Sequence, residues 1–390
     1  MSDKVTELHT EEKPARRRNV KKIVLLTALV VVVCLVLSLI LFKDELNLDR
    51  VRRWFKYMGD KNDESFGRYA FDSHGSNAYG GFDGGLAVAS IGGLDTYAED
   101  GTHRHMIQQQ LDLPQLLTRG SIAVAYDVGG YNLVAADKKK GEVLRLEETH
   151  PILDADISSG GAICISSSDS GYKSVLSVYN GKQDLVYRWL SASVYYPLCA
   201  IAPNGSDLAA ISVGQSEGTF QSSICLFRTD SEEIKGEISL GSELIYDLVY
   251  LSGNKLCAIG ETGIQFVSTG GDVVGTYQYQ DSYLKDFDLG GDGFLTLSTN
   301  MYRAGNRYSI VTVDHKGREM ASKYIGEEVL DISACGRYVA VLTQGKLTVY
   351  TKSLSVYYET EEAADATSVV MRSDGTAILI GGGQGRLYIP

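Results

Sequence analysis

Hydrophobic residues follow one pattern before residue 60 and a different pattern after it. The first is an uncharged, mostly apolar run of twenty residues from Ile23 to Phe42. As a helix, this run is long enough to cross the hydrocarbon core of a bilayer, which is about 30 Å thick. A cleaved signal peptide has a shorter apolar segment of about 7–15 residues, followed by small residues. The run therefore predicts a permanent transmembrane helix over residues 23–42.

The residues before this run predict its orientation. Residues 1–22 form a polar tail that ends in five positive charges, Arg16, Arg17, Arg18, Lys21 and Lys22. Positively charged residues beside a membrane span are enriched on the cytoplasmic side. We therefore expect a cytoplasmic tail, a single span that has the lipid bilayer as its partner, and an extracytoplasmic C-terminal part.

Residues 43–65 connect the predicted span to the rest of the chain. Leu48, Val51, Phe55 and Met58 recur on one face of a helix, and most basic residues of the segment lie outside that face. This spacing predicts a short amphipathic helix, which could rest on the outer headgroups or cover the underside of a folded domain. A polar linker follows it, up to residue 65.

From residue 66 onward, short apolar runs alternate with turns rich in glycine, asparagine and aspartate, which indicates β-strands. The runs form units of four, whose first runs start near Gly80, Leu113, Ile152, Tyr195, Leu244, Tyr283, Val329 and Ala366. A mean spacing of about 41 residues is typical of WD40-like repeats and of four-stranded propeller blades. The periodic Trp-Asp pairs of true WD40 repeats are missing, because the only tryptophans are Trp54 and Trp189. The pattern predicts an all-β domain over residues 66–390, a β-propeller of about eight blades, with seven as the alternative.

The two ends of the repeat region are incomplete in complementary ways. The last unit contains three runs before Pro390, whereas the run at residues 67–73 precedes the first unit. We predict that Phe66–Ser73 supplies the fourth strand of the last blade. This arrangement closes the ring and removes an exposed sheet edge.

Charge and cysteine usage restrict the possible partners. The net charge is −12, and because residues 1–56 contain twelve Lys or Arg against seven Asp or Glu, the remainder is more acidic still. An acidic domain repels the phosphates of nucleic acid, so we predict no nucleic-acid partner. The cysteines beyond the predicted span occur in apolar runs without metal-ligand spacing, which favours buried core positions for Cys164, Cys199, Cys225, Cys257 and Cys335.

Several short strings match catalytic or metal-binding motifs without the structural context that these motifs need. Gly214–Gly218 satisfies the GxSxG string of serine hydrolases and Ser170–Lys173 satisfies SxxK, yet both lie between predicted strands rather than beside a helix. His103 and His105 lack a third ligand at a recognisable spacing. The segment Asp286–Asp292 lacks the terminal glutamate of a calcium loop. We therefore predict no catalytic residue, no metal site and no cofactor.

Loop lengths predict which face of the propeller binds a partner. The turns between first and second strands and between third and fourth strands look tight, whereas those between second and third strands look longer, at residues 127–131, 168–174, 213–222 and 300–308. Loops that exceed what a connection requires often carry function, although they can also be tolerated insertions. The predicted binding residues are their aromatic and polar members, Asp127, Tyr131, Ser170, Tyr172, Lys173, Phe220, Tyr302 and Arg303.

Five segments carry a resemblance to a known family. They are RVRRWF (50–55), FGRYAFDS (66–73), YDVGGYNL (126–133), SSDSGYKSVLSVYNG (167–181) and DGTAILIGGGQGRLYIP (374–390). With the basic tail and the apolar run, they resemble a family of uncharacterised, single-pass membrane-anchored proteins of clostridial bacteria. The resemblance implies a propeller-like domain of unknown function in the same topology, and it transfers no catalytic motif.

Three functional hypotheses follow. The first is an extracytoplasmic propeller that binds a cell-envelope protein or glycan without catalysing a reaction. The second is a hydrolase or lyase of envelope polysaccharide that uses acidic residues at the propeller channel, for which two carboxylates about 5–10 Å apart are expected. The third is a structural partner in a membrane complex, assembled through residues 23–58.

Overall fold

The computed structural model describes residues 24–33, 48–58, 65–72, 76–216 and 218–390. The chain divides into two compact units, Met1–Gly59 and Asp60–Pro390. In the first unit, residues 24–33 are helical, and the rest of the predicted 23–42 span lies outside the described residues. Among the described residues, none of the helices combines the length and the apolar character that crossing a membrane requires.

The amphipathic helix predicted near residue 48 is confirmed as the helix α2, which spans Leu48–Tyr57. Trp54, Phe55 and Met58 each expose more than half of their surface. The basic residues Arg52 and Lys56 are exposed as well. The helix thus presents both apolar and basic side chains. Most of the linker predicted after it, residues 59–64, lies outside the described residues.

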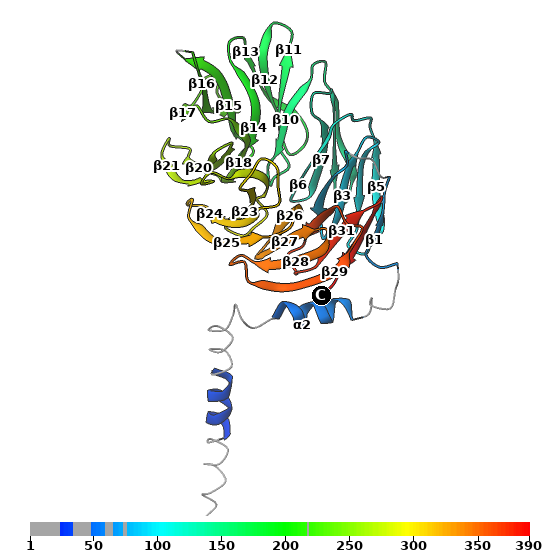
Figure 1. Ribbon diagram of the computed structural model, residues 1–390. Helices are drawn as coiled ribbons and strands as arrows, with labels where there is room; N and C mark the ends of the chain where they lie inside the picture. The colour runs from blue at the N-terminus through cyan, green and yellow to red at the C-terminus, as the bar shows by residue number, and fades with distance from the viewer. Residues whose placement is uncertain (1–23, 34–47, 59–64, 73–75, 217) are drawn as a thin grey trace, which may run out of the picture. The chain divides into compact units, whose positions relative to one another are not determined.

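The described part of the unit Asp60–Pro390 contains eight four-stranded antiparallel sheets, which are the blades of a β-propeller (Figure 1). Blades 1 and 2 comprise β2 (Ala78–Phe82), β3 (Gly85–Ser90), β4 (Gly93–Tyr97) and β5 (His103–Gln108), then β6 (Pro114–Arg119), β7 (Ile122–Asp127), β8 (Asn132–Asp137) and β9 (Gly141–Glu147). Blades 3 and 4 comprise β10 (Ile152–Ile157), β11 (Ile163–Asp169), β12 (Tyr172–Tyr179) and β13 (Leu185–Ser191), then β14 (Tyr195–Ile201), β15 (Asp207–Ser216), β16 (Thr219–Arg228) and β17 (Gly236–Gly241).

The second half of the ring repeats this plan. Blades 5 and 6 comprise β18 (Ile245–Ser252), β19 (Lys255–Gly260), β20 (Gly263–Ser268) and β21 (Val273–Gln278), then β22 (Tyr283–Asp288), β23 (Phe294–Asn300), β24 (Tyr308–Asp314) and β25 (Glu319–Ile325). Blade 7 comprises β26 (Val329–Cys335), β27 (Tyr338–Thr343), β28 (Gly345–Thr351) and β29 (Val356–Ala363). Blade 8 combines β30 (Ser368–Met371), β31 (Ala377–Gly381) and β32 (Gln384–Tyr388) with β1 (Arg68–Ala70). The prediction of eight blades is confirmed, and every predicted unit start lies within two residues of the observed first strand.

Ring closure by the N-terminal strand is also confirmed. β1 pairs antiparallel with β32, in a register that places Tyr69 opposite Gly385, and Figure 1 shows β1 beside the red C-terminal strands. Tyr69 is buried, and its hydroxyl donates a hydrogen bond to the carbonyl of Glu99 in blade 1 at 2.9 Å. In return, the Tyr97 hydroxyl of blade 1 donates to the carbonyl of Ala70 at 2.7 Å. β1 is therefore held both to β32 within blade 8 and, by these two side-chain hydrogen bonds, to blade 1.

The hydrophobic core consists of clusters between adjacent blades. The second strands β3, β7, β23 and β27 are buried along their whole length, because blades cover both of their faces. Such strands read as continuous apolar runs rather than as strict alternation. Between blades 3 and 4, the rings of Trp189 and Tyr196 both meet Phe227 edge-on. Cys164, Cys199, Cys225 and Cys257 are buried thiols as predicted, and Cys335 is partly buried.

The prediction that the connections between second and third strands are long loops is only partly right. We call the end of the propeller formed by the second-to-third-strand connections and the connections between blades the upper face, and the opposite end the lower face. Residues 213–222 are mostly strand, because β15 and β16 continue pairing as far as Ser216 and Thr219. Residues 168–174 likewise belong mainly to β11 and β12. Polar residues extend these hairpins because ladder hydrogen bonds use backbone groups, whatever the side chain.

Candidate functional site

The first strand of each blade lines the central channel, and four of these strands carry an aspartate at the same position. The residues are Asp154 of β10, Asp247 of β18, Asp286 of β22 and Asp331 of β26. Each follows a shift in the pairing register with the second strand. A β-bulge bends a strand and redirects the next side chain. The recurring pattern is therefore a bulge that sets an aspartate at the channel.

Three of these carboxylates bind the backbone of the next blade. The N–H of Cys199 donates to Asp154 Oδ2 at 2.8 Å, and the N–H of Val369 donates to Asp331 Oδ2 at 2.7 Å. Asp286 Oδ2 accepts from the N–H of Ile332 at 3.3 Å. These bonds connect first strands that share no sheet. The carboxylates thus have a structural role in holding adjacent blades together.

The same carboxylates titrate abnormally. Burial raises the pKa of Asp154 to about 7, and the negative charges of Asp247 and Asp156 add to the shift. Burial also raises the pKa of Asp247 to about 6, with Asp156 adding to it, and the pKa of Asp286 to about 6, with Asp331 adding to it. Arg119 of β6 is the cation in this group, with its Nη2 3.8 Å from Asp156 Oδ1. The channel therefore holds carboxyl groups that take up protons near neutral pH.

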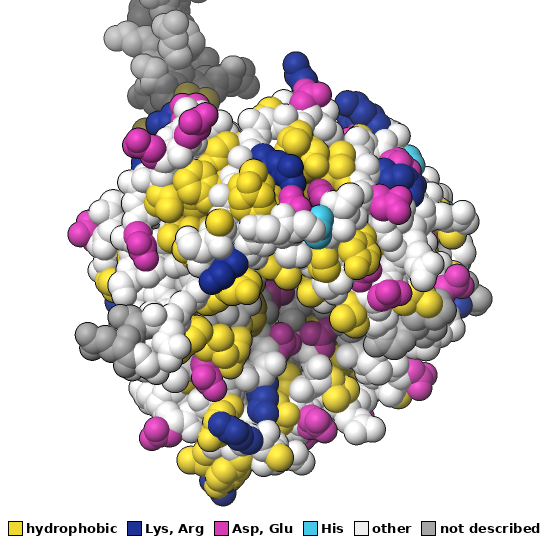
Figure 2. Space-filling view, turned by 90° about the horizontal axis from the view of Figure 1, so that it is seen from above, with side chains coloured by type: hydrophobic (Ala, Val, Ile, Leu, Met, Phe, Trp, Pro, Cys, Tyr) yellow, Lys and Arg dark blue, Asp and Glu magenta, His cyan; other side chains and the backbone are white. Residues whose placement is uncertain are grey.

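Sequence reasoning missed this set, although a signal was present. The strings ILD (152–154), IYD (245–247), LKD (284–286) and VLD (329–331) occupy the same place in four units. Within the described residues, no group of three or more His, Cys, Asp or Glu is arranged to hold a metal ion. Figure 2 shows hydrophobic side chains around a central hollow that contains acidic side chains.

Exposed hydrophobic residues form a ring on the upper face. They lie at the starts of first strands and in the connections of that face, and they include Ile91, Leu113, Tyr131, Tyr172, Tyr195, Phe220, Leu244, Tyr246, Tyr283, Met301, Tyr302 and Leu330. We call this set of twelve residues, seven of which are aromatic, the aromatic ring, by which we mean the set around the upper face and not the ring of one side chain. Tyrosine gives large contact area at a low entropic cost and is enriched in binding surfaces. The aromatic ring is the candidate binding surface of this protein.

The structure brings most of the predicted binding residues to this surface. Tyr131, Tyr172, Phe220 and Tyr302 are exposed members of the aromatic ring. Two basic residues among the predicted binding residues, Lys173 and Arg303, lie against members of the aromatic ring that the sequence analysis did not name as binding residues. The Lys173 ammonium lies 4.9 Å from the centre of the Tyr195 ring, and the Arg303 guanidinium lies 5.3 Å from the centre of the Tyr283 ring.

Asp127 and Ser170 are engaged within the protein. Asp127 is buried, and its Oδ1 accepts hydrogen bonds from the N–H groups of Asp112 at 3.0 Å and Leu113 at 2.7 Å. Its carboxylate therefore holds the connection from blade 1 to blade 2 rather than facing solvent. Ser170 Oγ lies 3.0 Å from His150 Nε2, which ties its turn to the preceding connection.

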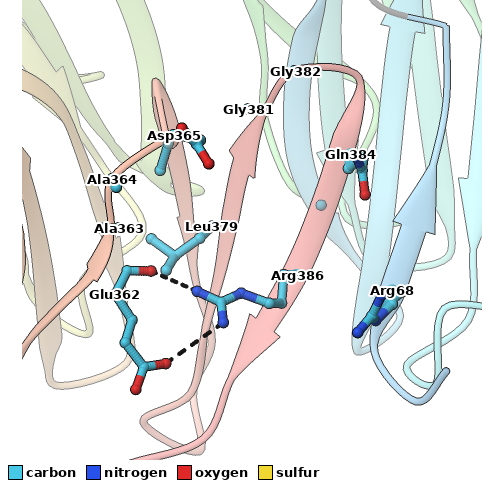
Figure 3. Close-up of a pocket in the computed structure, with 12 residues that line it drawn as sticks. Arg68, Glu362, Ala363, Ala364, Asp365, Leu379, Gly381, Gly382, Gln384 and Arg386 are labelled. Atoms are coloured by element: carbon cyan, nitrogen blue, oxygen red, sulfur yellow. Dashed lines mark hydrogen bonds and ion pairs between the residues drawn. The ribbon is translucent and has the colours of Figure 1, made fainter. Parts of the chain in front are cut away.

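Clefts open between neighbouring blades. One, about 770 Å³, lies between blades 7 and 8 and is lined by Arg386, Glu362 and Arg68 (Figure 3). There, Arg386 Nη2 donates to the carbonyl of Glu362, and Arg386 Nη1 lies 3.5 Å from Glu362 Oε2, so its charge is already matched. Another, about 530 Å³, lies between blades 3 and 4 and is lined by Trp189 among other residues. A further one, about 360 Å³, lies between blades 5 and 6 and contains Arg303.

The family comparison identifies the propeller region. The model of the family of unknown function DUF5711 matches residues 57–383. This chain belongs to DUF5711. The match covers nearly all of the propeller and confirms the expected placement in an uncharacterised family. Among curated proteins, no sequence matches this DUF5711 member.

Solved structures resemble this DUF5711 chain in fold. The C-terminal WD40 domain of Sif2 is similar with a TM-score of 0.58 at 13% identity, over 84% of this chain and 98% of that domain. Hydrazine synthase of Kuenenia stuttgartiensis has a TM-score of 0.46 at 12% identity, over 69% of this chain and 92% of that chain. The RRP9 WD40 repeats have a TM-score of 0.45 at 10% identity, over 67% of this chain and 84% of that chain. The likeness to the Sif2 domain shows a WD40-like propeller without the Trp-Asp signature.

Proposed function

We propose that this protein is a membrane-anchored, extracytoplasmic binding module that recognises a cell-envelope protein or glycan without catalysis. The observation that carries the proposal is the aromatic ring, which gathers exposed hydrophobic side chains on one face of the domain, whereas the other exposed ones lie mostly along the outer fourth strands of separate blades. Scattered exposed hydrophobic residues are ordinary, whereas a grouped set indicates an interaction surface.

The proposal that the propeller lies on the extracytoplasmic side of the membrane rests on the sequence. The apolar run Ile23–Phe42 and the basic residues before it favour a single span with a cytoplasmic tail. β1 is the fourth strand of blade 8 and starts at the lower face, so the chain enters the propeller there. We expect the upper face to be the one available to an envelope partner.

A polysaccharide-active enzyme is the second candidate, and one observation favours it. The pKa values of about 7 for Asp154 and about 6 for Asp247 fall in the range useful for proton transfer at neutral pH. The hydrogen bond that Asp154 accepts from Cys199 supports a structural role instead. Turnover of wall polysaccharide by the purified protein, abolished by Asp154→Asn, would favour the enzyme over the binding module.

Affinity capture of the tagged full-length protein from its native membrane, followed by mass spectrometry and glycan analysis, tests the proposal. The test variant combines Tyr131→Ala, Tyr172→Ala and Tyr302→Ala. The matched control combines Val273→Ala, Met320→Ala and Val356→Ala, which removes exposed hydrophobic side chains near the lower face. We expect the first variant to lose the captured partner at an unchanged melting temperature and the control to retain it. Equal capture by both variants would refute the proposed surface.

A further inference from the structure

The cleft between blades 5 and 6 opens on the upper face, and two of its residues, Tyr246 and Tyr283, belong to the aromatic ring. It is lined by Tyr246, Glu261, Tyr283, Leu284, Lys285 and Arg303, and its volume is about 360 Å³. Tyr246 and Tyr283 stand near the starts of the first strands β18 and β22, whereas Glu261 and Arg303 come from second-to-third-strand connections. The volume lies in the usual range of small-ligand sites, about 300–1,000 Å³.

The loop that supplies Arg303 is held in place by its own contacts. Lys285 Nζ donates to the carbonyl of Arg303 at 2.7 Å, and the Arg303 guanidinium lies over the Tyr283 ring. Asn300 Nδ2 donates to the carbonyl of Gly305 at 2.6 Å, and Asn300 Oδ1 accepts from the N–H of Tyr302 at 3.0 Å. These bonds fold residues 300–305 against the blade. The two cations are therefore positioned before any ligand arrives, which lowers the entropic cost of binding.

Two of the six residues that line the cleft, Lys285 and Arg303, are basic. Some exposed basic residues of the domain, such as Arg104, Arg188 and Arg318, form ion pairs with aspartates. Within the described part of the chain, Lys285 and Arg303 form no ion pair with a carboxylate. The two cations of the cleft outnumber its one carboxylate, that of Glu261, which favours an anionic group on the ligand. A guanidinium and an ammonium that line one cleft suit a carboxylate, which the guanidinium can bind with two parallel hydrogen bonds.

The remaining groups favour a sugar as the carrier of that carboxylate. The residues Tyr246 and Tyr283 are each more than 40% exposed, and their aromatic side chains give the cleft flat apolar surface against which the C–H groups of a pyranose can stack. Glu261 is exposed and accepts hydrogen bonds only, whereas the phenol groups both donate and accept. Sugar hydroxyls donate to such a carboxylate. An acidic peptide would instead bring further carboxylates towards Glu261.

We propose that this cleft binds a carboxylate-bearing sugar unit of a glycan chain, with the carboxylate on Arg303 and Lys285 and the ring against Tyr246 and Tyr283. The inference rests on the proposed binding function and names the ligand class for it. Glu261 then accepts hydrogen bonds from the sugar hydroxyls. The open sides of the cleft allow the glycan to continue across the upper face towards the other residues of the aromatic ring.

Isothermal titration calorimetry, in which oligogalacturonate is titrated into the full-length protein in detergent, tests this assignment. The test variant combines Lys285→Ala and Arg303→Ala, and the control combines Lys139→Ala and Lys140→Ala, two exposed lysines of the lower-face turn between β8 and β9. Both variants change the net charge equally, so a non-specific charge effect lowers binding in both. We expect a loss of at least tenfold in affinity in the test variant only. Tyr283→Ala should also weaken binding.

Two further probes complete the test. Neutral galacto-oligosaccharide of the same length should bind at least tenfold more weakly, and poly-glutamate peptide should not compete. Equal affinity for the neutral sugar, equal loss in the test and control variants, or tighter binding of poly-glutamate would each overturn the assignment. If oligogalacturonate fails to bind while the aromatic-ring variant still loses its captured envelope partner, the ligand class falls and the binding function stands.

Discussion

Asp331 Oδ2 accepts a hydrogen bond from the backbone N–H of Val369 at 2.7 Å, which joins the first strand of blade 7 to the first strand of blade 8. The Ser368 hydroxyl donates to the same oxygen. Asp154 and Cys199 repeat the arrangement between blades 3 and 4. The first strands of adjacent blades belong to different sheets, so side-chain bonds of this kind supply directional contact between them.

Asp331→Ala should destabilise the propeller. The N–H of Val369, a buried residue, loses its acceptor, and an unsatisfied buried donor costs about 1–3 kcal/mol. Asp230→Ala is the control, because Asp230 forms an exposed ion pair with Arg228, and such pairs contribute about 0–1 kcal/mol. Urea unfolding at pH 7 measures both. Equal midpoints for the two variants would contradict the inter-blade role of Asp331.

Stability should decrease as the pH rises from about 4 to 8. In the unfolded chain an aspartate ionises near pH 3.9, whereas in the folded protein the pKa of Asp154 is about 7 and that of Asp247 about 6. Between these values the folded state binds more protons than the unfolded state, so raising the pH favours unfolding. The effect is complete near pH 8, about one unit above the pKa of Asp154, and the slope ends there.

Thermal melts between pH 4.5 and pH 8 check this prediction. We expect a higher melting temperature at pH 5 than at pH 7.5, and a smaller difference in Asp154→Asn, which cannot ionise. Surface carboxyls such as Asp83 do not mask the effect, because hydrogen bonds from Arg104 and Lys138 lower the pKa of Asp83, and such groups act only at more acidic pH. A melting temperature that rises over this pH window would contradict the assignment.

Deleting Phe66–Ser73 should unfold the propeller or make it associate. The deletion removes β1, exposes the edge of β32, and eliminates the buried Tyr69 ring. Tyr69→Ala alone should cost about 3–5 kcal/mol, as expected for a buried aromatic residue. Deleting Met1–Arg18 is the control and should leave the melting temperature unchanged. Size-exclusion chromatography and thermal melts read out both deletions, and identical behaviour would disprove the closure role.

The topology prediction can be tested on intact cells from which the wall has been removed. If the tail is cytoplasmic and residues 66–390 lie outside, added protease should degrade the propeller and spare a tag placed before Arg16. The positive charges next to the apolar run are the physical reason for this expectation. Full protection of the propeller, with degradation only after permeabilisation, would show the opposite orientation.

The sequence by itself determined the number and order of the strands. Apolar runs and glycine-rich turns are local signals, so the predicted unit starts at Ile152, Tyr195, Tyr283 and Val329 coincide with the first residues of β10, β14, β22 and β26. The missing fourth run at the C-terminus and the spare run at residues 67–73 were enough to predict closure, because an open sheet edge is unfavourable. The amphipathic period around residue 48 gave α2 in the same way.

Only the tertiary structure decided which residues meet across blades. Asp154 and Cys199 are 45 residues apart, and their contact depends on a bulge and on the rotation between blades rather than on local pattern. Tyr246, Tyr283 and Arg303 form one cleft because two first strands and one connection converge between blades 5 and 6. Loop lengths were misjudged at residues 213–222 because backbone pairing continues through polar residues. Periodicity fixes which residues form strands, whereas the packing of neighbouring sheets fixes which side chains share a surface.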